Sequence, residues 1–166
     1  MSNVRQQDEH MKRATYYTSL TATLAVGAEL SRRGYDVGFT IGNTPRIDLL
    51  SAVPDGQSFK IQVKGISNPM GFWVQKAFFH ARLQPDLFLI IVLVPSRDDS
   101  RLRFFVLSHA DAKHEFSKMP KYKRDGRPYE NGSGLYWKSI TPYENAWAKL
   151  PNLRSHTDAR KSGARR

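Results

Sequence analysis

The feature that most constrains the fold is an unbroken run of eight apolar residues at positions 87–94. The run is far too short to span a bilayer. It has no polar positions and is rich in aliphatic residues, which predicts a buried strand in the centre of a sheet. At 166 residues, the chain is long enough to bury such a strand in one domain without metal or disulfide support.

The charge of the chain indicates the class of its partner. Lys and Arg number 26 against 15 Asp and Glu, which gives a net charge of +11. This surplus favours a polyanion, most often a nucleic acid. The chain has no cysteine, so disulfides, thiolate metal sites and cysteine catalysis are excluded.

Composition also divides the chain into three parts. Residues 1–14 are polar, without the apolar segment of a secretory signal, and predict a flexible N-terminus. Residues 15–150 predict one folded domain. Residues 151–166 carry five basic residues and one acidic residue without apolar periodicity, and predict a disordered basic tail. We therefore expect a soluble cytoplasmic protein that does not enter the membrane.

Periodicity and turn signals predict the order of the elements. A helix is expected over residues 15–33, ended by a cap at Gly34. Its predicted apolar stripe is Leu20, Leu24, Ala28 and Leu30. Strands are expected at residues 35–41, 46–53, 59–64, 87–94, 102–107 and 135–140.

The remaining segments complete this outline. Residues 72–83 are ambiguous, because some of their apolar positions suit a short helix and others blur its period. Ser108 is expected to cap a helix that continues to about Phe116, and Pro142 to open a last helix through residue 150. One helix followed by three strands and then mixed elements indicates an α/β or α+β domain around one sheet.

Three polar residues on two neighbouring predicted strands suggest chemistry. Asp48 is an acid between apolar residues, so its carboxylate needs a cation or a metal as partner. Gln62 and Lys64 are two residues apart and point to one face of their strand. Phosphodiester hydrolysis uses such a set, because carboxylate and amide oxygens hold Mg²⁺ and a lysine orients water or stabilises charge. The structural alternative is an Asp48–Lys64 ion pair beside a solvated Gln62.

At these residues the chain resembles the PD-(D/E)XK nuclease superfamily, in particular small bacterial members and their Holliday-junction resolvase relatives. The resemblance spans residues 15–110 and rests on the runs Ile47-Asp48-Leu49-Leu50 and Ile61-Gln62-Val63-Lys64. It implies a restriction-endonuclease-like α/β fold with αβββαβ order and a central mixed sheet of four to five strands flanked by helices. It also implies an Mg²⁺- or Mn²⁺-dependent DNA endonuclease with catalytic Asp48, Gln62 and Lys64.

The resemblance further implies a metal site formed by Asp48, Gln62 and the backbone of Val63, and a homodimer among the arrangements to consider. The chain departs from the family pattern at two positions. Gln62 replaces the usual Asp or Glu, and Thr23 stands where many members carry a helix glutamate. Glu29 is the nearest acid on that helix, but its spacing to Arg32 and Arg33 favours a surface ion pair slightly over a metal-site role.

Basic residues outside the site predict contacts to nucleic acid. The candidates are Lys76, Lys121, Lys123, Arg124 and Arg127. The last four lie in a polar loop with two tyrosines, which suits phosphate contact and base stacking as well as it suits a solvated surface. Two other functions stay open: a nucleic-acid-binding module whose nuclease site has decayed, and a subunit of a defence or mobile-element complex.

Overall fold

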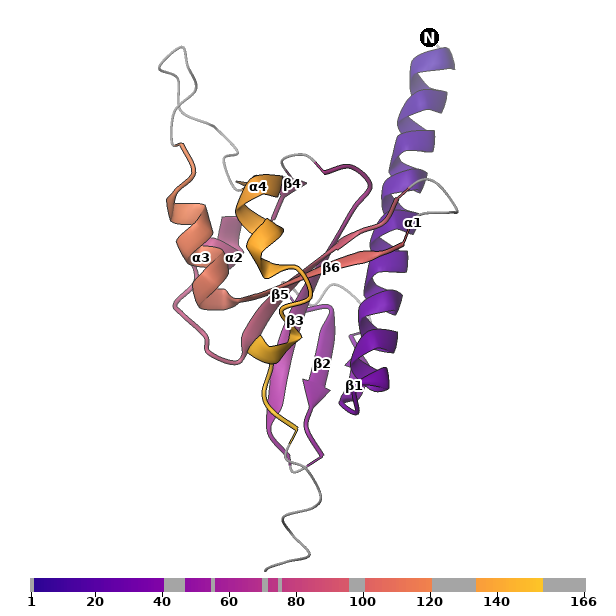
Figure 1. Ribbon diagram of the computed structural model, residues 1–166. Coiled ribbons are helices and arrows are strands. Elements are labelled where there is room, and N and C mark those ends of the chain that lie inside the picture. Colours follow the sequence, from indigo (N-terminus) through magenta and orange to yellow (C-terminus); the bar gives the residue numbers. More distant parts are fainter. Residues whose placement is uncertain are drawn as a thin grey trace, which may run out of the picture.

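The computed structural model describes residues 2–40, 47–54, 56–69, 72–74, 76–95, 101–120 and 134–153. It shows an α/β fold around a mixed five-stranded sheet in the order β1-β2-β3-β5-β6 (Figure 1). The strands are β1 (Asp36–Phe39), β2 (Leu49–Ala52), β3 (Ser58–Ile66), β5 (Leu87–Leu93) and β6 (Arg103–Ser108). Neighbouring strands are antiparallel except β3 and β5, which run parallel.

The apolar run forms the centre of this sheet, as predicted. The first six residues of β5 are all buried, between β3 and β6. The strands at 35–41, 46–53, 59–64 and 102–107 are also confirmed, with ends that differ by one to three residues where they are described.

The long helix α1 (Ser2–Arg32) covers one face of the sheet. It begins 13 residues before the predicted start, because residues 2–14 contain neither glycine nor proline to stop a helix. At its other end Gly34 adopts φ +94°, and the N–H groups of Gly34 and Tyr35 donate to the carbonyls of Ser31 and Leu30. These two bonds form a Schellman cap, so the predicted end is confirmed.

The predicted apolar stripe of α1 is confirmed at Leu30 and was wrong at Leu20, Leu24 and Ala28, which are exposed. The helix buries Ala22, Val26 and Leu30, whereas Leu20 and Leu24 are exposed. Close approach to β3 decides this choice. A Cβ at Gly65 would lie 2.5 Å from the carbonyl oxygen of Thr18, so only small groups fit where the helix crosses the strand. The short distance between α1 and β3 therefore favours the face with Ala22, Val26 and Leu30 over the face with Leu20 and Leu24.

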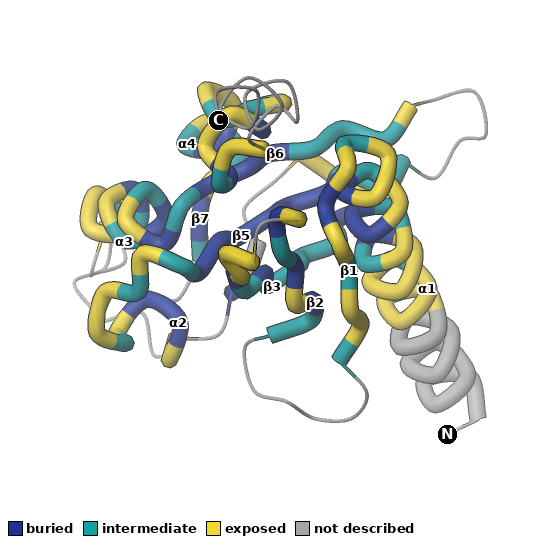
Figure 2. Tube along the Cα trace, turned by 90° about the horizontal axis from the view of Figure 1, so that it is seen from below, coloured by how far each residue is buried: buried dark blue, intermediate teal, exposed yellow. Residues whose placement is uncertain are grey.

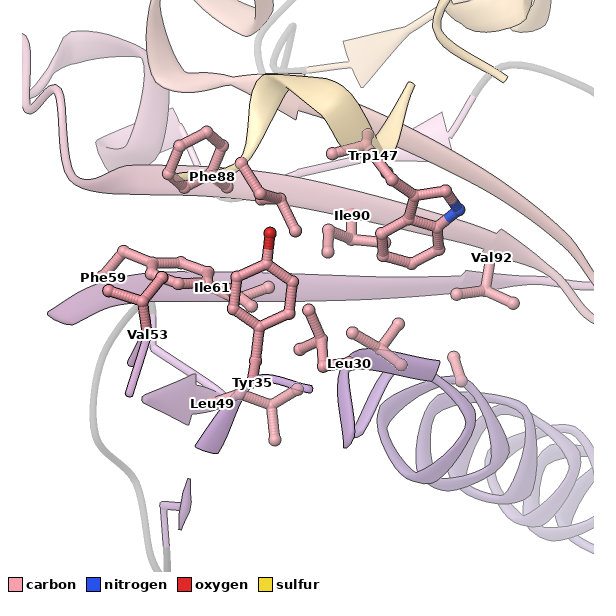
Figure 3. Close-up of a cluster of buried hydrophobic side chains, with 14 residues drawn as sticks. Leu30, Tyr35, Leu49, Val53, Phe59, Ile61, Phe88, Ile90, Val92 and Trp147 are labelled. Carbon is pink, nitrogen blue, oxygen red and sulfur yellow. The ribbon is translucent and has the colours of Figure 1, made fainter. Parts of the chain in front are cut away.

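Two apolar clusters occupy the two faces of the sheet. The α1 core lies between α1 and the sheet, and Figure 3 shows its side chains. Its buried members are Ala22, Val26, Leu30, Tyr35, Leu49, Val53, Phe59, Ile61, Phe88, Ile90, Val92, Val106, Trp147 and Leu150. The α3 core lies on the opposite face. Its buried members are Ile66, Val74, Phe78, Phe79, Leu87, Leu89, Ile91, Phe105, Leu107, Ala112, Leu135 and Ile140.

The α3 core covers only half of its face. Its strand residues come from β5, β6, the last residue of β3 and the short strand β7 (Gly134–Leu135), and they pack under α2 (Lys76–His80) and α3 (His109–Ser117). On β2, by contrast, Leu50 is exposed on this face. Figure 2 shows the same gradient, from buried β5 to the largely exposed β1. We call the uncovered part over β1, β2 and β3 the open half.

The helices after β3 and β6 settle two predictions. Residues 72–83 contain the short helix that part of their pattern suits, α2, which follows the short strand β4 (Phe72–Trp73) that pairs with β7. Ser108 caps α3 as predicted. Its hydroxyl accepts from the N–H of Asp111, whose carboxylate accepts in return from the N–H of Ser108.

The predictions for the last part of the chain were wrong. Residues 135–140 form mainly the short helix α4 (Trp137–Ile140), and residues 142–150 form two 3₁₀ turns, η1 (Thr141–Tyr143) and η2 (Trp147–Lys149). Between them Glu144 bridges to Phe105 on β6, and Asn145 takes φ +52°. This contact with the sheet edge interrupts a continuous helix.

The predicted tail begins with residues that contact the domain. The hydroxyl of Tyr35 donates to the carbonyl of Pro151 at 2.8 Å, while residues 154–166 lie outside the described residues. In the described part of the chain, none of the helices combines the length and apolarity that crossing a membrane requires.

Candidate functional site

The fold brings Asp48, Gln62 and Lys64 to one face of the sheet. Leu49 pairs with Ile61, and the N–H of Asp48 also donates to the Ile61 carbonyl, so Asp48 lies next to the Ile61–Val63 segment of β3. Ile61 and Val63 point into the α1 core, so the alternation of a strand directs Gln62 and Lys64 to the other face. They lie at the boundary between the open half and the covered half, because their β5 partners Leu89 and Ile91 belong to the α3 core.

Asp48 is held at the start of β2 by backbone contacts. Its N–H donates to the carbonyl of Ile61 at 2.9 Å, and its own carbonyl accepts from the N–H of Thr40 at 3.1 Å. Its carboxylate accepts from the N–H of Val63 at 2.7 Å. Burial raises the pKa of this carboxyl above its usual value, although the Val63 N–H and the charge of Lys64 partly oppose the rise. A carboxylate in this position gains from a bound cation.

Thr40 is a positioning residue that the sequence analysis missed. Its hydroxyl lies 2.8 Å from the carbonyl oxygen of Ile47 and 3.1 Å from that of Asp48. Together with its N–H, Thr40 fixes the backbone on which Asp48 stands. Thr40 directly follows β1 and bonds to Asp48, which directly precedes β2. The pairing of the two predicted strands is the sequence signal that could have identified it.

Gln62 carries the least satisfied polar atom of the site. Its side-chain oxygen Oε1 is buried and has no hydrogen-bond partner among the described residues. A buried acceptor without a donor costs about 1–3 kcal/mol, so such atoms are rare in folded proteins. A cation bound at this oxygen would recover the loss.

The contacts of Lys64 contradict the structural alternative. No ion pair joins Asp48 to Lys64 in the described structure, and the Gln62 oxygen is buried rather than solvated. The charge of Lys64 still lowers the pKa of Asp48, so the ammonium acts on the carboxylate through space. Lys60 lies on the same face, two residues before Gln62, but its ammonium is paired with Asp86 at 2.9 Å.

The backbone carbonyl of Val63 completes the candidate donor set. The Ile61 carbonyl and the Val63 N–H both point toward β2, where they meet Asp48. The two residues have the same parity on β3, so the Val63 carbonyl points to the same side. One carboxylate, one unpartnered amide oxygen and one carbonyl therefore come from neighbouring positions at the start of β2 and on β3, and hard oxygen donors of this kind fit Mg²⁺ or Mn²⁺.

Glu29 is not brought to this set. Its carboxylate accepts from Arg32 at 2.8 and 2.9 Å and from Arg33 at 3.0 Å. The ion pairs expected from helical spacing are thus present, and the Arg32 hydrogen bond is the largest influence that lowers the pKa of Glu29. The hydroxyl of Thr23 donates to the carbonyl of Ser19 within the helix. In the described residues, no group of three or more His, Cys, Asp or Glu side chains is placed to hold a metal.

The predicted nucleic-acid contacts fall mostly elsewhere. Lys76 is the first residue of α2, and its side chain lies outside what the structure describes. Lys121, Lys123, Arg124 and Arg127 lie outside the described residues. Comparison of the chain with models of protein families, with curated proteins and with solved structures finds no match. The argument for function therefore rests on the site itself.

Proposed function

We propose that this protein is a metal-dependent DNA endonuclease of the restriction-endonuclease-like fold. The observation that carries the proposal is the buried, unpartnered oxygen of Gln62, which is adjacent in sequence to Val63, whose N–H binds the partly buried carboxylate of Asp48. Two oxygen donors that the fold leaves undersatisfied are best explained by a cation that both would bind.

The topology supports the same proposal. An α1-β1-β2-β3-α2-β5 order runs through the larger sheet and its helices, with β1 to β3 antiparallel and β5 parallel to β3. The αβββαβ order that the family resemblance implies is consistent with this arrangement. Candidate residues on β2 and β3 then lie where two adjacent strands meet, at the border of an open sheet face.

The residues that would hold Mg²⁺ are Asp48, Gln62 and Val63, the last through its carbonyl. A divalent cation there supplies Lewis-acid stabilisation of phosphate charge and lowers the pKa of a bound water. Asp48 supplies the negative charge of the site, and Gln62 adds a neutral ligand. Because the set has one carboxylate rather than two, we expect binding in the millimolar range, on the order of free cellular Mg²⁺.

Lys64 would act on the reacting phosphate. Its ammonium shares a strand face with Gln62 and has no ion pair to Asp48 in the described structure. It can orient the attacking water by hydrogen bonding or stabilise the charge that develops on phosphate oxygens. The net charge of +11 supplies the attraction to a DNA backbone.

A decayed nucleic-acid-binding module is the second candidate function. Two features favour it: Gln62 is neutral, and no group of three or more His, Asp or Glu side chains in the described residues is placed to hold a metal. A subunit of a defence or mobile-element complex, in which a partner supplies missing groups, is a variant of this candidate. Both predict DNA binding that does not depend on metal.

A cleavage assay separates these candidates. The full chain is incubated with supercoiled, linear, branched and single-stranded DNA in Mg²⁺, Mn²⁺ or EDTA. Asp48→Asn and Lys64→Ala test the site, and Lys60→Ala is the matched control, since it removes a lysine from the same face whose charge is already paired with Asp86.

Metal-dependent cutting that Asp48→Asn and Lys64→Ala abolish and Lys60→Ala retains supports the endonuclease. Cutting that survives Asp48→Asn contradicts the proposed site. Salt-sensitive DNA binding in EDTA without cutting in either metal favours the binding module instead.

A further inference from the structure

The outer face of α1 carries an exposed apolar surface. We call it the α1 patch and define it by Tyr16, Tyr17, Leu20 and Leu24 with the adjacent Phe39 of β1. These five side chains are 40–62% exposed. They lie on the opposite side of the helix from Ala22, Val26 and Leu30, which fill the α1 core.

The members of the patch adjoin one another. Tyr16 and Tyr17 form an edge-to-face ring pair with centroids 5.5 Å apart, and Leu20 and Leu24 follow at helical spacing. Phe39 reaches the same helix face, because a Cβ at Gly27 would lie 2.5 Å from its ring. Together the five side chains expose on the order of 500 Å² of largely apolar surface, at the upper end of what monomeric proteins show.

Charge decides what kind of partner fits this surface. Residues 14–28 contain no Asp, Glu, Lys or Arg, although a quarter of the whole chain is charged. The five side chains of the patch carry no charge, so they themselves offer no cation to DNA phosphates or acidic lipid headgroups. Aromatic rings and leucines without charges are the composition of the centre of a protein–protein interface.

The patch is also complementary to itself. Its large rings lie toward the N-terminal end, whereas Ala28 and Ser31, on the same exposed face, are small. An antiparallel pairing sets the tyrosines of one copy over the small residues of the other, and it opposes the two helix dipoles favourably. Two copies of the patch would bury about 1,000 Å², the minimum for a specific interface.

We propose that the protein forms a homodimer through antiparallel contact of the α1 patches of two copies. The helix backbone continues from the patch to Ser2 and projects past the sheet in Figure 1, so a second copy can lie alongside it. The contact lies over the outer side of α1, on the sheet face opposite Gln62 and Lys64, and leaves the open half free. The proposal does not depend on the endonuclease activity.

Sedimentation equilibrium in EDTA without DNA tests the dimer, so the result is separate from that of the cleavage assay. Leu24→Glu is compared with Leu83→Glu, because both leucines are 52% exposed but Leu83 lies outside the patch. We expect a concentration-dependent dimer for the native chain and Leu83→Glu. For Leu24→Glu we expect at least a tenfold increase in the dimer dissociation constant, with an unchanged circular dichroism spectrum.

The orientation has its own test, because the chain has no native cysteine. Ala14→Cys and Ala28→Cys lie on exposed positions at the two ends of the patch. When the two variants are mixed and oxidised, antiparallel pairing predicts a mixed disulfide, and parallel pairing predicts that each variant links to itself. A native chain that stays monomeric to 100 µM (about the concentration range in which transient interfaces still form), or a dimer that Leu24→Glu and Leu83→Glu weaken equally, overturns the proposal.

Discussion

The covered half and the open half of one sheet face differ in whether their buried polar groups have hydrogen-bond partners. In the covered half, His109 is fully buried, and both ring nitrogens have backbone partners, the N–H of Gln84 at 3.1 Å and the carbonyl of Phe78 at 2.8 Å. Glu115 is likewise bound by Lys118 and Tyr143. At the edge of the open half, the Gln62 oxygen is buried without a partner, and Asp48 carries a raised pKa.

This difference separates stability from function. Satisfied buried polar groups fix a unique packing, whereas an unsatisfied one costs stability and persists where it serves another purpose. His109 is thus a structural core residue. Gln62, whose buried oxygen has no partner among the described residues, is the residue for which the fold alone gives no reason.

The largest expected effect is the loss of DNA cleavage caused by the substitution Asp48→Asn. The amide keeps an oxygen for the Val63 N–H but removes the negative charge that holds the cation, so we expect about a 10³-fold loss of metal-dependent cleavage. Urea unfolding checks that the variant stays as stable as the native chain. Asp36→Asn, which changes an exposed acid on β1, is the control and should retain cleavage.

His109→Leu should give the converse result. It leaves the N–H of Gln84 and the carbonyl of Phe78 without partners inside the α3 core, which lowers the free energy of unfolding by about 2–4 kcal/mol. Urea unfolding measures the loss. Cleavage per folded molecule should stay near native, and a large fall in that activity at temperatures where the variant is folded would contradict the division between the two halves.

Gln62→Met tests whether the buried Gln62 oxygen at the edge of the open half lowers the stability of the fold. Methionine has a similar length without the buried carbonyl, so we expect the free energy of unfolding to rise by about 1 kcal/mol while cleavage falls. Thermal unfolding in EDTA and the cleavage assay measure the two quantities. A less stable variant would show that the Gln62 oxygen is already satisfied in the folded chain.

The smallest expected effect is on the pH dependence of stability, to which Asp48 and Glu29 should contribute with opposite signs. Burial raises the pKa of Asp48 in the folded state, so its ionised form destabilises the fold above that pKa, and the penalty disappears as pH falls. As pH rises from 3 to 7, the free energy of unfolding of Asp48→Asn should therefore increase relative to that of the native chain.

Glu29→Gln is the matched control for that measurement. The hydrogen bond from Arg32 lowers the pKa of Glu29, so its stabilising contribution is present above the unfolded value and lost as pH falls through the folded pKa. Glu29→Gln should thus lose stability relative to the native chain over the same rise in pH. Equal slopes for the two variants would contradict the pKa directions.

Local chemistry made some elements predictable. Gly34 and Ser108 ended one helix and began another where the sequence indicated, because a left-handed glycine and a capping hydroxyl act within a few residues. The region after residue 134 was not predictable in the same way. There the contact of Glu144 with β6 replaces the expected helix by 3₁₀ turns, and that contact joins residues far apart in the chain.

For the candidate site, the alternation of β3 was enough to place Gln62 and Lys64 on one face, and the acid within an apolar run was enough to single out Asp48. The sequence by itself determined the central strand, the flanking strands and these three residues, since periodicity and caps are local properties. Only the tertiary structure decided that α1 packs through Ala22, Val26 and Leu30, leaving Leu20 and Leu24 exposed, and that the Gln62 oxygen is buried without a partner. Both outcomes depend on how closely separate elements approach one another, which no local pattern encodes.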